Sequence, residues 1–233
     1  MIDTIVRGTQ HVLECAVASG AQKFLLTSSG AIYGQQPPDM THLEEDFAGA
    51  PDSKAVNAPY AIGKRLAEVL CHRMAATSML ETKIARGFAF VGPWLPLDLH
   101  FAAGNFIRDA LRGGPIVING DGRPFRSYLY AADLTAWLWI ILFSGPAGET
   151  INVGSDQAFP LSEIARKIAG LTSPSPEIVI RSPEQPGPAS RYIPSIAKAR
   201  QLLGLDVWHS LDKALEKTFA WYRQWNSMQS DGV

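Results

Sequence analysis

Several features that define other classes of protein are scarce in these 233 residues. Only two cysteines occur, Cys15 and Cys71, and both fall in segments with helical periodicity, so a disulfide framework is not expected. The longest apolar run, residues 134–143, is about half as long as a membrane-spanning helix. The N-terminus lacks the basic-then-apolar pattern of a secretory signal. These absences predict a soluble protein of the reducing cytoplasm with no membrane partner.

The chain also lacks an excess of positive or negative charge. Lys and Arg total 21 and Asp and Glu total 22, which leaves a formal net charge of -1. Such a chain has no surplus positive charge with which to bind nucleic acid or an anionic membrane, so neither is an expected partner. The five His residues and the acidic residues of the segment 39–46 show no regular ligand spacing, so no metal site is predicted.

Apolar residues make up 46% of the chain, which is enough for one large domain or two small ones. Segments of helical periodicity alternate with short apolar runs, so the predicted fold class is α/β. The predicted helices include residues 2–19, 59–76 and 161–169 and a buried helix at 133–143, and the predicted strands include 23–29, 82–87 and 150–153.

Tyr60 and Lys64 lie four residues apart, and Pro59 before them suits the first turn of a helix. This spacing places the phenol and the ammonium on one helix face. A cation held there favours the phenolate, which makes the phenol a proton-transfer group for alcohol and ketone chemistry. A surface lysine beside a half-buried tyrosine has the same spacing, so the neighbouring motifs must decide between the two interpretations.

The apolar segment 23–29 ends in the two hydroxyl residues Ser28 and Ser29, a pattern typical of a buried parallel strand. Ligands of open α/β sheets bind beyond the carboxyl ends of the strands. Ser29 is therefore expected at the mouth of the sheet, where a substrate oxygen would contact both Ser29 and Tyr60. Serines at a strand end more often form turns, but a strand, a hydroxyl and a Tyr-x-x-x-Lys motif in this order favour a catalytic site.

These motifs resemble those of the extended short-chain dehydrogenase/reductases, in particular the NAD-dependent epimerase/dehydratase family that acts on nucleotide sugars. The resemblance covers nearly the whole chain, and it implies a partial Rossmann-like parallel sheet with a smaller C-terminal α/β region. Residues 1–92 would form the C-terminal part of an NAD(P)-binding domain. Residues 93–233 would mainly bind the nucleotide sugar, with some strands and helices returning to the main sheet. The matching segments are Gly8-Thr9, Ser28 to Gly34, Tyr60 to Lys64, Arg86 to Pro93, Gly120 to Asp133 and Asn152 to Ser155.

The resemblance implies catalytic roles for Ser29, Tyr60 and Lys64. Tyr60 would be the acid/base, Lys64 its partner and a contact to the nicotinamide ribose, and Ser29 the hydrogen-bond partner of the reacting sugar oxygen. Ser28 and Phe88 would lie with Tyr60 and Lys64 at the cofactor, NAD or NADP. A core phenylalanine after a strand is an equally good interpretation of Phe88.

The resemblance also implies substrate contacts, from Ser29 and from polar residues of the C-terminal region. Arg126 is the first candidate for the diphosphate because the forked donors of arginine suit two phosphate oxygens, and Arg191 is a second candidate. A solvated surface arginine is the alternative interpretation of Arg126. Asn105 and Asn119 are predicted to touch the nucleotide.

Gly30 and Ala31 limit the reactions that are expected of this chain. Dehydratases of this family carry Asp-Glu after the catalytic hydroxyl, where the Glu abstracts a proton and the Asp protonates the leaving water. Neither Gly30 nor Ala31 can move a proton, so 4,6-dehydration is not expected. The remaining reactions are epimerisation by transient oxidation and reduction of a keto-sugar. Ala89 replaces the family's usual Asn before the Gly-Pro corner, which leaves the identity of the nucleotide sugar open.

No Gly-rich, pyrophosphate-binding turn occurs before Ser28. At about 30 residues per βαβ unit, roughly 70 to 100 residues of the family pattern are lacking. We therefore expect the cofactor to bind a full-length form and to bind the chain as given poorly. A truncated or non-catalytic nucleotide-sugar-binding relative is the alternative to an enzyme. The resemblance further implies a homodimer, since helices that match residues 2–19 and 59–76 commonly form an intersubunit four-helix bundle.

Overall fold

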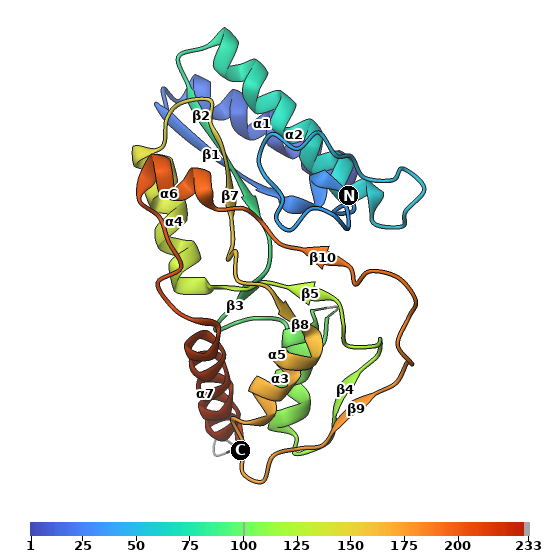
Figure 1. Cartoon of the computed structure of the whole chain (residues 1–233). Helices are drawn as coiled ribbons and strands as arrows, with labels where there is room; N and C mark the ends of the chain where they lie inside the picture. The colour runs from blue at the N-terminus through green and yellow to red at the C-terminus, as the bar shows by residue number, and fades with distance from the viewer. Residues whose placement is uncertain (100, 231–233) are drawn as a thin grey trace. The chain divides into compact units, whose positions relative to one another are not determined.

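A computed structural model describes residues 1–99 and 101–230 of the chain. The chain folds into two compact units, coloured along the sequence in Figure 1. Both units combine helices with short strands, which confirms the predicted α/β class. Unit 1 comprises Met1–Phe88, Leu134–Asp156 and Tyr192–Asp206, and unit 2 comprises Ala89–Asp133, Gln157–Arg191 and Val207–Val233.

The centre of unit 1 is a parallel sheet. The register pairs Ser29 with Gly87 and Gly87 with Val153, so the carboxyl ends of all three strands lie at one edge. Two strands have the predicted bounds, and the middle one begins one residue earlier than predicted. In spatial order the strands are β1 (Lys23–Ser29), β2 (Glu81–Gly87) and β7 (Thr150–Val153).

Helices cover the sheet of unit 1, with α1 and α2 on one side and α4 and α6 on the other (Figure 1). Their bounds are α1 (Ile2–Ala18), α2 (Ala58–Thr77), α4 (Ala131–Ser144) and α6 (Ala197–Leu203). Pro59 lies in the first turn of α2, as predicted. The core under α1 and α2 consists of Leu13, Leu26, Ala67, Cys71, Leu80 and Ile84.

The helix predicted to be buried, α4, is buried on one face only. Trp137 and Ile141 are fully buried, and the Trp137 indole donates to the carbonyl of Asp206 at 3.1 Å. Trp139 and Phe143 are each 58% exposed, and their rings stack 5.5 Å apart. The prediction was wrong because the outward face of α4 is also apolar, so no polar residue in the sequence marks which side meets water.

A 3-10 helix, η1 (Gly30–Tyr33), follows β1, and a long loop then leads to α2. Two residues anchor this loop inside unit 1. Leu43 is fully buried and forms an isolated parallel bridge with Pro194. The Gln36 side-chain oxygen accepts a hydrogen bond from the backbone N–H of Ile193 at 2.9 Å.

Among its described residues, unit 2 contains three helices and three small sheets, two of which are parallel pairs of strands. The helices are α3 (Ala102–Leu111), α5 (Leu161–Ala169) and α7 (Leu211–Ser230). The strand pairs are β3 (Phe90–Val91) with β6 (Leu129–Tyr130), β4 (Ile116–Ile118) with β9 (Ile178–Ile180), and the antiparallel β5 (Phe125–Arg126) with β8 (Phe159–Pro160). A last strand, β10 (Arg191–Tyr192), lies where the chain passes from unit 2 to unit 1.

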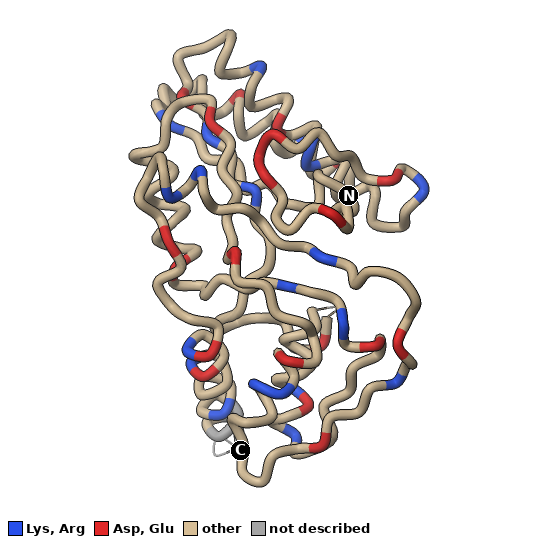
Figure 2. The backbone as a smooth tube through the Cα atoms, viewed as in Figure 1, with Lys and Arg blue, Asp and Glu red and all other residues tan. Residues whose placement is uncertain are grey.

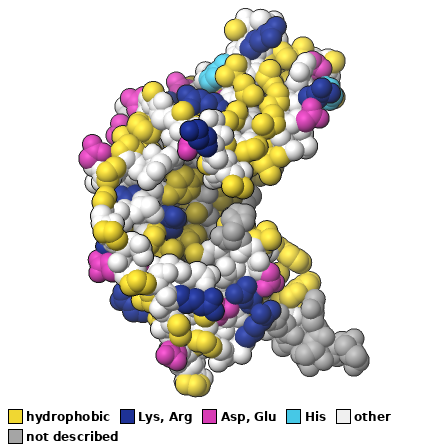
Figure 3. Space-filling view, turned by 90° about the vertical axis from the view of Figure 1, so that its right-hand side faces the viewer, with side chains coloured by type: hydrophobic (Ala, Val, Ile, Leu, Met, Phe, Trp, Pro, Cys, Tyr) yellow, Lys and Arg dark blue, Asp and Glu magenta, His cyan; other side chains and the backbone are white. Residues whose placement is uncertain are grey.

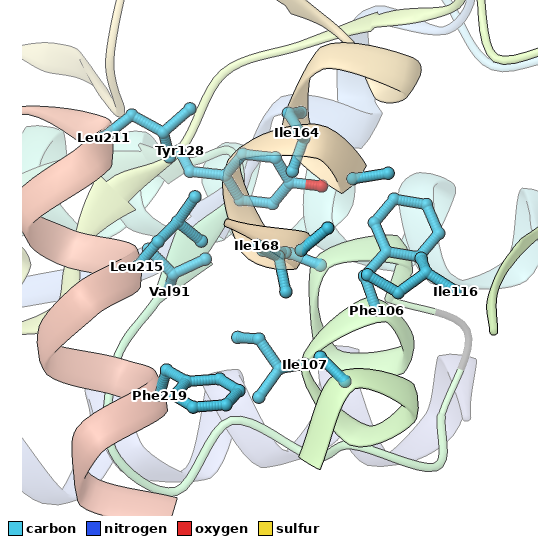
Figure 4. Packing of buried hydrophobic residues seen from close by; sticks show 14 of the residues in the cluster. Val91, Phe106, Ile107, Ile116, Tyr128, Ile164, Ile168, Leu211, Leu215 and Phe219 are labelled. Atoms are coloured by element: carbon cyan, nitrogen blue, oxygen red, sulfur yellow. The ribbon is translucent and has the colours of Figure 1, made fainter. Parts of the chain in front are cut away.

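The core of unit 2 lies between its helices. Figure 4 shows Ile107 of α3, Ile168 of α5, and Leu215 and Phe219 of α7 pointing toward one another. All four are at most 5% exposed. Tyr128 joins this cluster, and burial raises the pKa of its phenol to about 12. Unit 2 therefore has an apolar core of its own.

Figure 2 shows positively and negatively charged residues interspersed along both units, in line with the near-zero net charge. Among the described helices, none is both long enough and apolar enough to cross a membrane.

Candidate active site

Tyr60 and Lys64 share one face of α2, beside the carboxyl end of β1. The Lys64 ammonium donates to the backbone carbonyl of Thr27 at 2.7 Å and lies 5.9 Å from the centre of the Tyr60 ring. A cation at this distance is attracted by the face of the ring. Burial lowers the pKa of the Lys64 ammonium, while Tyr60 is 37% exposed. The structure thus holds a partly desolvated cation next to an accessible phenol.

The two serines at the end of β1 are both buried and have different partners. The Ser29 hydroxyl accepts a hydrogen bond from the backbone N–H of Ala31 at 3.2 Å and so caps η1. The Ser28 hydroxyl donates to Glu68 at 2.5 Å. Successive residues of a strand point to opposite faces of the sheet, which explains why the two hydroxyls have different partners. Ser28, predicted at the cofactor, is therefore bound to a buried carboxylate of α2.

Glu68 is the centre of a buried polar network that the sequence analysis missed. Arg86 of β2 donates to both Glu68 carboxylate oxygens, from Nε at 3.1 Å and from Nη2 at 2.8 Å. Its Nη1 donates to the Tyr33 hydroxyl at 2.7 Å and to the backbone carbonyl of Glu45 at 2.9 Å. Glu68 lies one turn after Lys64 and two turns after Tyr60, and this i, i+4, i+8 spacing was the available sequence signal.

The network continues from Tyr33 to β7. The Tyr33 hydroxyl donates to the Asn152 side-chain oxygen at 2.8 Å, and burial raises the pKa of Tyr33 to about 12, so this phenol stays neutral. The backbone N–H of Asn152 donates to the Glu45 carboxylate at 2.8 Å, and burial raises the pKa of Glu45. The Asn152 amide also donates to the carbonyl of Leu43 at 2.9 Å. Together these bonds join β1, β2, β7, α2 and the loop after η1.

Phe88 directly follows β2 and is a partly buried residue that packs against other aromatic side chains. Its ring lies 4.7 Å from the ring of Tyr192 and 6.2 Å from that of Tyr33. It adjoins the buried cluster of Ile32, Tyr33 and Leu43. This packing agrees with the core interpretation of Phe88.

In unit 2, the structure brings the two predicted arginines to one residue, Phe125 of β5. Arg126 donates from Nη1 to the Phe125 carbonyl at 2.7 Å. The Arg191 guanidinium carbon lies 4.6 Å from the centre of the Phe125 ring. Both predicted arginines therefore contact Phe125, Arg126 at its backbone and Arg191 at its ring.

The two asparagines predicted to touch the nucleotide hold loops in unit 2. The Asn105 amide donates to the carbonyls of Leu97 and Leu99, both at 2.7 Å. The Asn119 side-chain oxygen accepts from Arg181 at 3.2 Å. A polar side chain near a turn can hydrogen-bond the loop or bind a ligand, and the sequence pattern is the same for both roles.

Arg123, which the sequence analysis did not select, fixes the loop that leads to Arg191. It donates to the Glu184 carboxylate at 2.5 Å and to the carbonyl of Gln185 at 3.0 Å. The carboxylate of Asp121 accepts from the backbone N–H of Gln185 at 3.1 Å. A groove of about 400 Å³ lies here, lined by Gly120, Asp121, Arg123, Pro124, Ser182, Gln185, Pro186, Pro188, Ala189 and Ser190.

The chain is similar in sequence to a known protein family and to individual proteins. The model of a protein family described as "NAD dependent epimerase/dehydratase family" matches residues 1–154. The chain is 31% identical over 217 residues to UDP-glucuronic acid decarboxylase 1 of Xenopus tropicalis, an alignment that covers 93% of this chain and 50% of that protein. It is 33% identical over 225 residues to UDP-glucuronic acid decarboxylase 2 of Arabidopsis thaliana, covering 96% and 49%. The chain thus spans about half the length of the curated relatives it matches.

The chain also resembles solved structures of enzymes that act on nucleotide sugars. A UDP-glucose 4-epimerase of Thermotoga maritima, solved with UDP-glucose, has a TM-score of 0.86 at 25% identity, and the match covers 97% of this chain and 71% of that one. A UDP-glucuronic acid 4-epimerase of Bacillus cereus, solved with NAD, has a TM-score of 0.80 at 25% identity, covering 95% and 68%. The DesIV dTDP-glucose 4,6-dehydratase of Streptomyces venezuelae, solved with NAD, has a TM-score of 0.79 at 26% identity, covering 97% and 68%.

Proposed function

The chain belongs to the NAD-dependent epimerase/dehydratase family, and from this premise we propose that it acts on a nucleotide sugar by NAD(P)-dependent oxidation and reduction. The observation that carries the proposal is the Tyr60–Lys64 pair on α2, with the Lys64 ammonium 2.7 Å from the Thr27 carbonyl at the end of β1. Ser29 ends the same strand. A phenol, a fixed cation and a hydroxyl at a strand end are the groups that alcohol–ketone interconversion requires.

When bound, NAD(P) supplies the acceptor and the donor of the hydride. Tyr60 takes the proton of the sugar hydroxyl as the carbonyl forms, and it returns the proton when the carbonyl is reduced. Lys64 stabilises the phenolate form of Tyr60 by its charge. Ser29 hydrogen-bonds the reacting oxygen. The half-buried ammonium and the neighbouring phenol fit the nicotinamide end of the cofactor, and we assign Tyr60 and Lys64 to it.

Epimerisation and keto-sugar reduction are the reactions that these residues support best. Gly30 and Ala31 lack the acid and base that 4,6-dehydration uses, which argues against that reaction. Decarboxylation of a nucleotide-linked uronic acid is a second candidate, because the curated relatives named above are UDP-glucuronic acid decarboxylases. Oxidation two carbons from a carboxylate gives a β-keto acid, which loses CO₂ while the electrons of the broken bond form an enolate. Protonation of the carbon that carried the carboxylate and return of the hydride to the ketone complete the reaction.

Product analysis separates these reactions. The purified protein is incubated with excess NAD and with UDP-glucose or UDP-glucuronic acid in turn, and the sugars are identified by NMR. Epimerisation gives a product with the same number of carbons, whereas decarboxylation gives a pentose and CO₂. Unchanged sugars with either substrate, together with measurable binding, would support the non-catalytic alternative.

We assign the diphosphate of the substrate to Arg126 and Arg191. Replacing Arg126 with alanine is expected to weaken binding of UDP about 10- to 100-fold, because a hydrogen bond between charged groups contributes about 1.5–3 kcal/mol. Isothermal titration calorimetry measures the change. Arg112→Ala is the control, since the side chain of Arg112 is 70% exposed and its Nη2 lies 4.0 Å from the Asp98 carboxylate. Equal affinities for the two variants would contradict the assignment.

We also propose a homodimer formed through α1 and α2. Figure 3 shows hydrophobic side chains gathered over the part of unit 1 that contains these helices. Exposed apolar residues there include Val12 and Val17 of α1 and Leu66 and Val69 of α2. Burial of such side chains against a second copy would remove them from water.

Replacing Val69 with glutamate is expected to weaken the dimer at least about 10-fold, because the charge would have to lose its hydration at the interface. Sedimentation at micromolar concentration measures the dissociation constant. Val56→Glu is the matched control, since Val56 is fully exposed and lies in the loop before α2. A wild-type monomer, or equal effects of the two substitutions, would count against this interface.

A further inference from the structure

The space next to Gly30 is filled by two aromatic side chains from distant parts of the sequence. A Cβ atom added to Gly30 would lie 2.6 Å from the Tyr192 hydroxyl oxygen and 2.7 Å from Cζ of Phe88. Real Cβ atoms do not approach other heavy atoms so closely, because carbon atoms in van der Waals contact are about 3.5 Å apart. Gly30 is itself buried and directly follows Ser29.

Hydrogen bonds fix the backbone beside both rings. The backbone N–H of Phe88 donates to the Val153 carbonyl at 3.0 Å. Tyr192 leads into Ile193, whose N–H and carbonyl are hydrogen-bonded to Gln36 and Leu43 at 2.9 and 2.8 Å. Both aromatic residues are thus fixed by the edge of the sheet and by the loop after η1.

We propose that Tyr192 is a specificity-determining residue of this site, an inference that rests on the proposed function. Its hydroxyl takes the volume that a side chain at position 30 would fill, immediately after Ser29. A phenol there hydrogen-bonds a sugar hydroxyl next to the oxygen that Ser29 contacts. Gly30 and Tyr192 therefore form a matched pair, in which the tyrosine requires the glycine.

A double-mutant cycle on thermal unfolding tests the pairing without any ligand. Gly30→Ala is expected to lower the melting temperature by several degrees. The loss should shrink by about half in the Tyr192→Ala background, where the nearest atom is gone and only the Phe88 ring remains in the way. Gly8→Ala is the control and should leave the melting temperature unchanged or higher, since nothing lies within 4 Å of the added Cβ and Gly8 is inside α1. An equal loss in both backgrounds, or no loss, overturns the pairing.

Tyr192→Phe tests the role in specificity, because it removes the hydroxyl and keeps the ring. UDP-glucose should bind this variant about 5- to 10-fold more weakly, as expected for one lost hydrogen bond, while UDP, which has no sugar, should bind unchanged. Equal affinity of the variant and the wild type for UDP-glucose overturns the role. If the wild type binds UDP-glucose no better than UDP, the sugar is not recognised, which counts against both the specificity role and the proposed function; the thermal cycle still decides the pairing of Gly30 with Tyr192.

Discussion

Replacing Glu68 with alanine is expected to lower the free energy of unfolding by about 3–5 kcal/mol, the cost of leaving a buried charge without its partner. The side chains of Glu68 and Arg86 are only 6% and 12% exposed, and two hydrogen bonds at 2.8 and 3.1 Å join them. The Ser28 hydroxyl would lose its acceptor as well. Chemical denaturation of the purified variant measures the change.

The control for this prediction is an ion pair of the same chemistry at the surface. Asp3 and Arg7 are one turn apart on α1, and each side chain is 74% exposed. Asp3→Ala should change the free energy of unfolding by no more than about 0.5 kcal/mol, because water screens such a pair. If the two variants lost similar amounts, the network around Glu68 would not have the structural role assigned to it.

Replacing Tyr60 with phenylalanine is expected to slow conversion of the sugar by about 10²- to 10⁴-fold, the usual contribution of a positioned acid/base group. The ring and its contact with the Lys64 ammonium remain, so binding of UDP-glucose should change little. The rate is followed by NMR of the sugar at saturating NAD and nucleotide sugar.

Tyr222→Phe is the matched control for this loss of a hydroxyl. The Tyr222 hydroxyl donates to the Leu95 carbonyl within unit 2, where it holds α7 to the segment after β3. Its removal should affect stability and leave the rate unchanged. Equal rates for the wild type and Tyr60→Phe would exclude Tyr60 as the acid/base.

The elements of the sheet in unit 1 were predictable because each strand has apolar residues at its centre and is closed by Ser or Gly. β1 and β7 have the bounds that the sequence predicts, and the family resemblance carried by the same segments is confirmed. The exposed face of α4 was not predictable, since Trp139 and Phe143 are as apolar as the buried Trp137. Hydrophobicity reports burial only where the exposed positions are polar.

The buried partners near the site were harder to predict than the helix that carries Tyr60 and Lys64. Glu68 has helical spacing to Lys64, but nothing local indicates that Arg86 of β2 is its partner. Tyr192 is far from Gly30 in sequence, and only the folded chain shows that its hydroxyl occupies the space beside that glycine. Contacts between distant segments depend on the packing of the whole unit, which periodicity and spacing do not describe.

The central claim is that the sugar is oxidised and reduced through hydride transfer, and an isotope experiment tests it most directly. UDP-glucose deuterated at carbon 4 is incubated with the protein and excess NAD in ordinary water, and the product is examined by NMR and mass spectrometry. Because hydride transfer never exposes this hydrogen to solvent, we predict that the 4-epimer retains the deuterium. A 4-epimer that has lost its deuterium to water would contradict the claim.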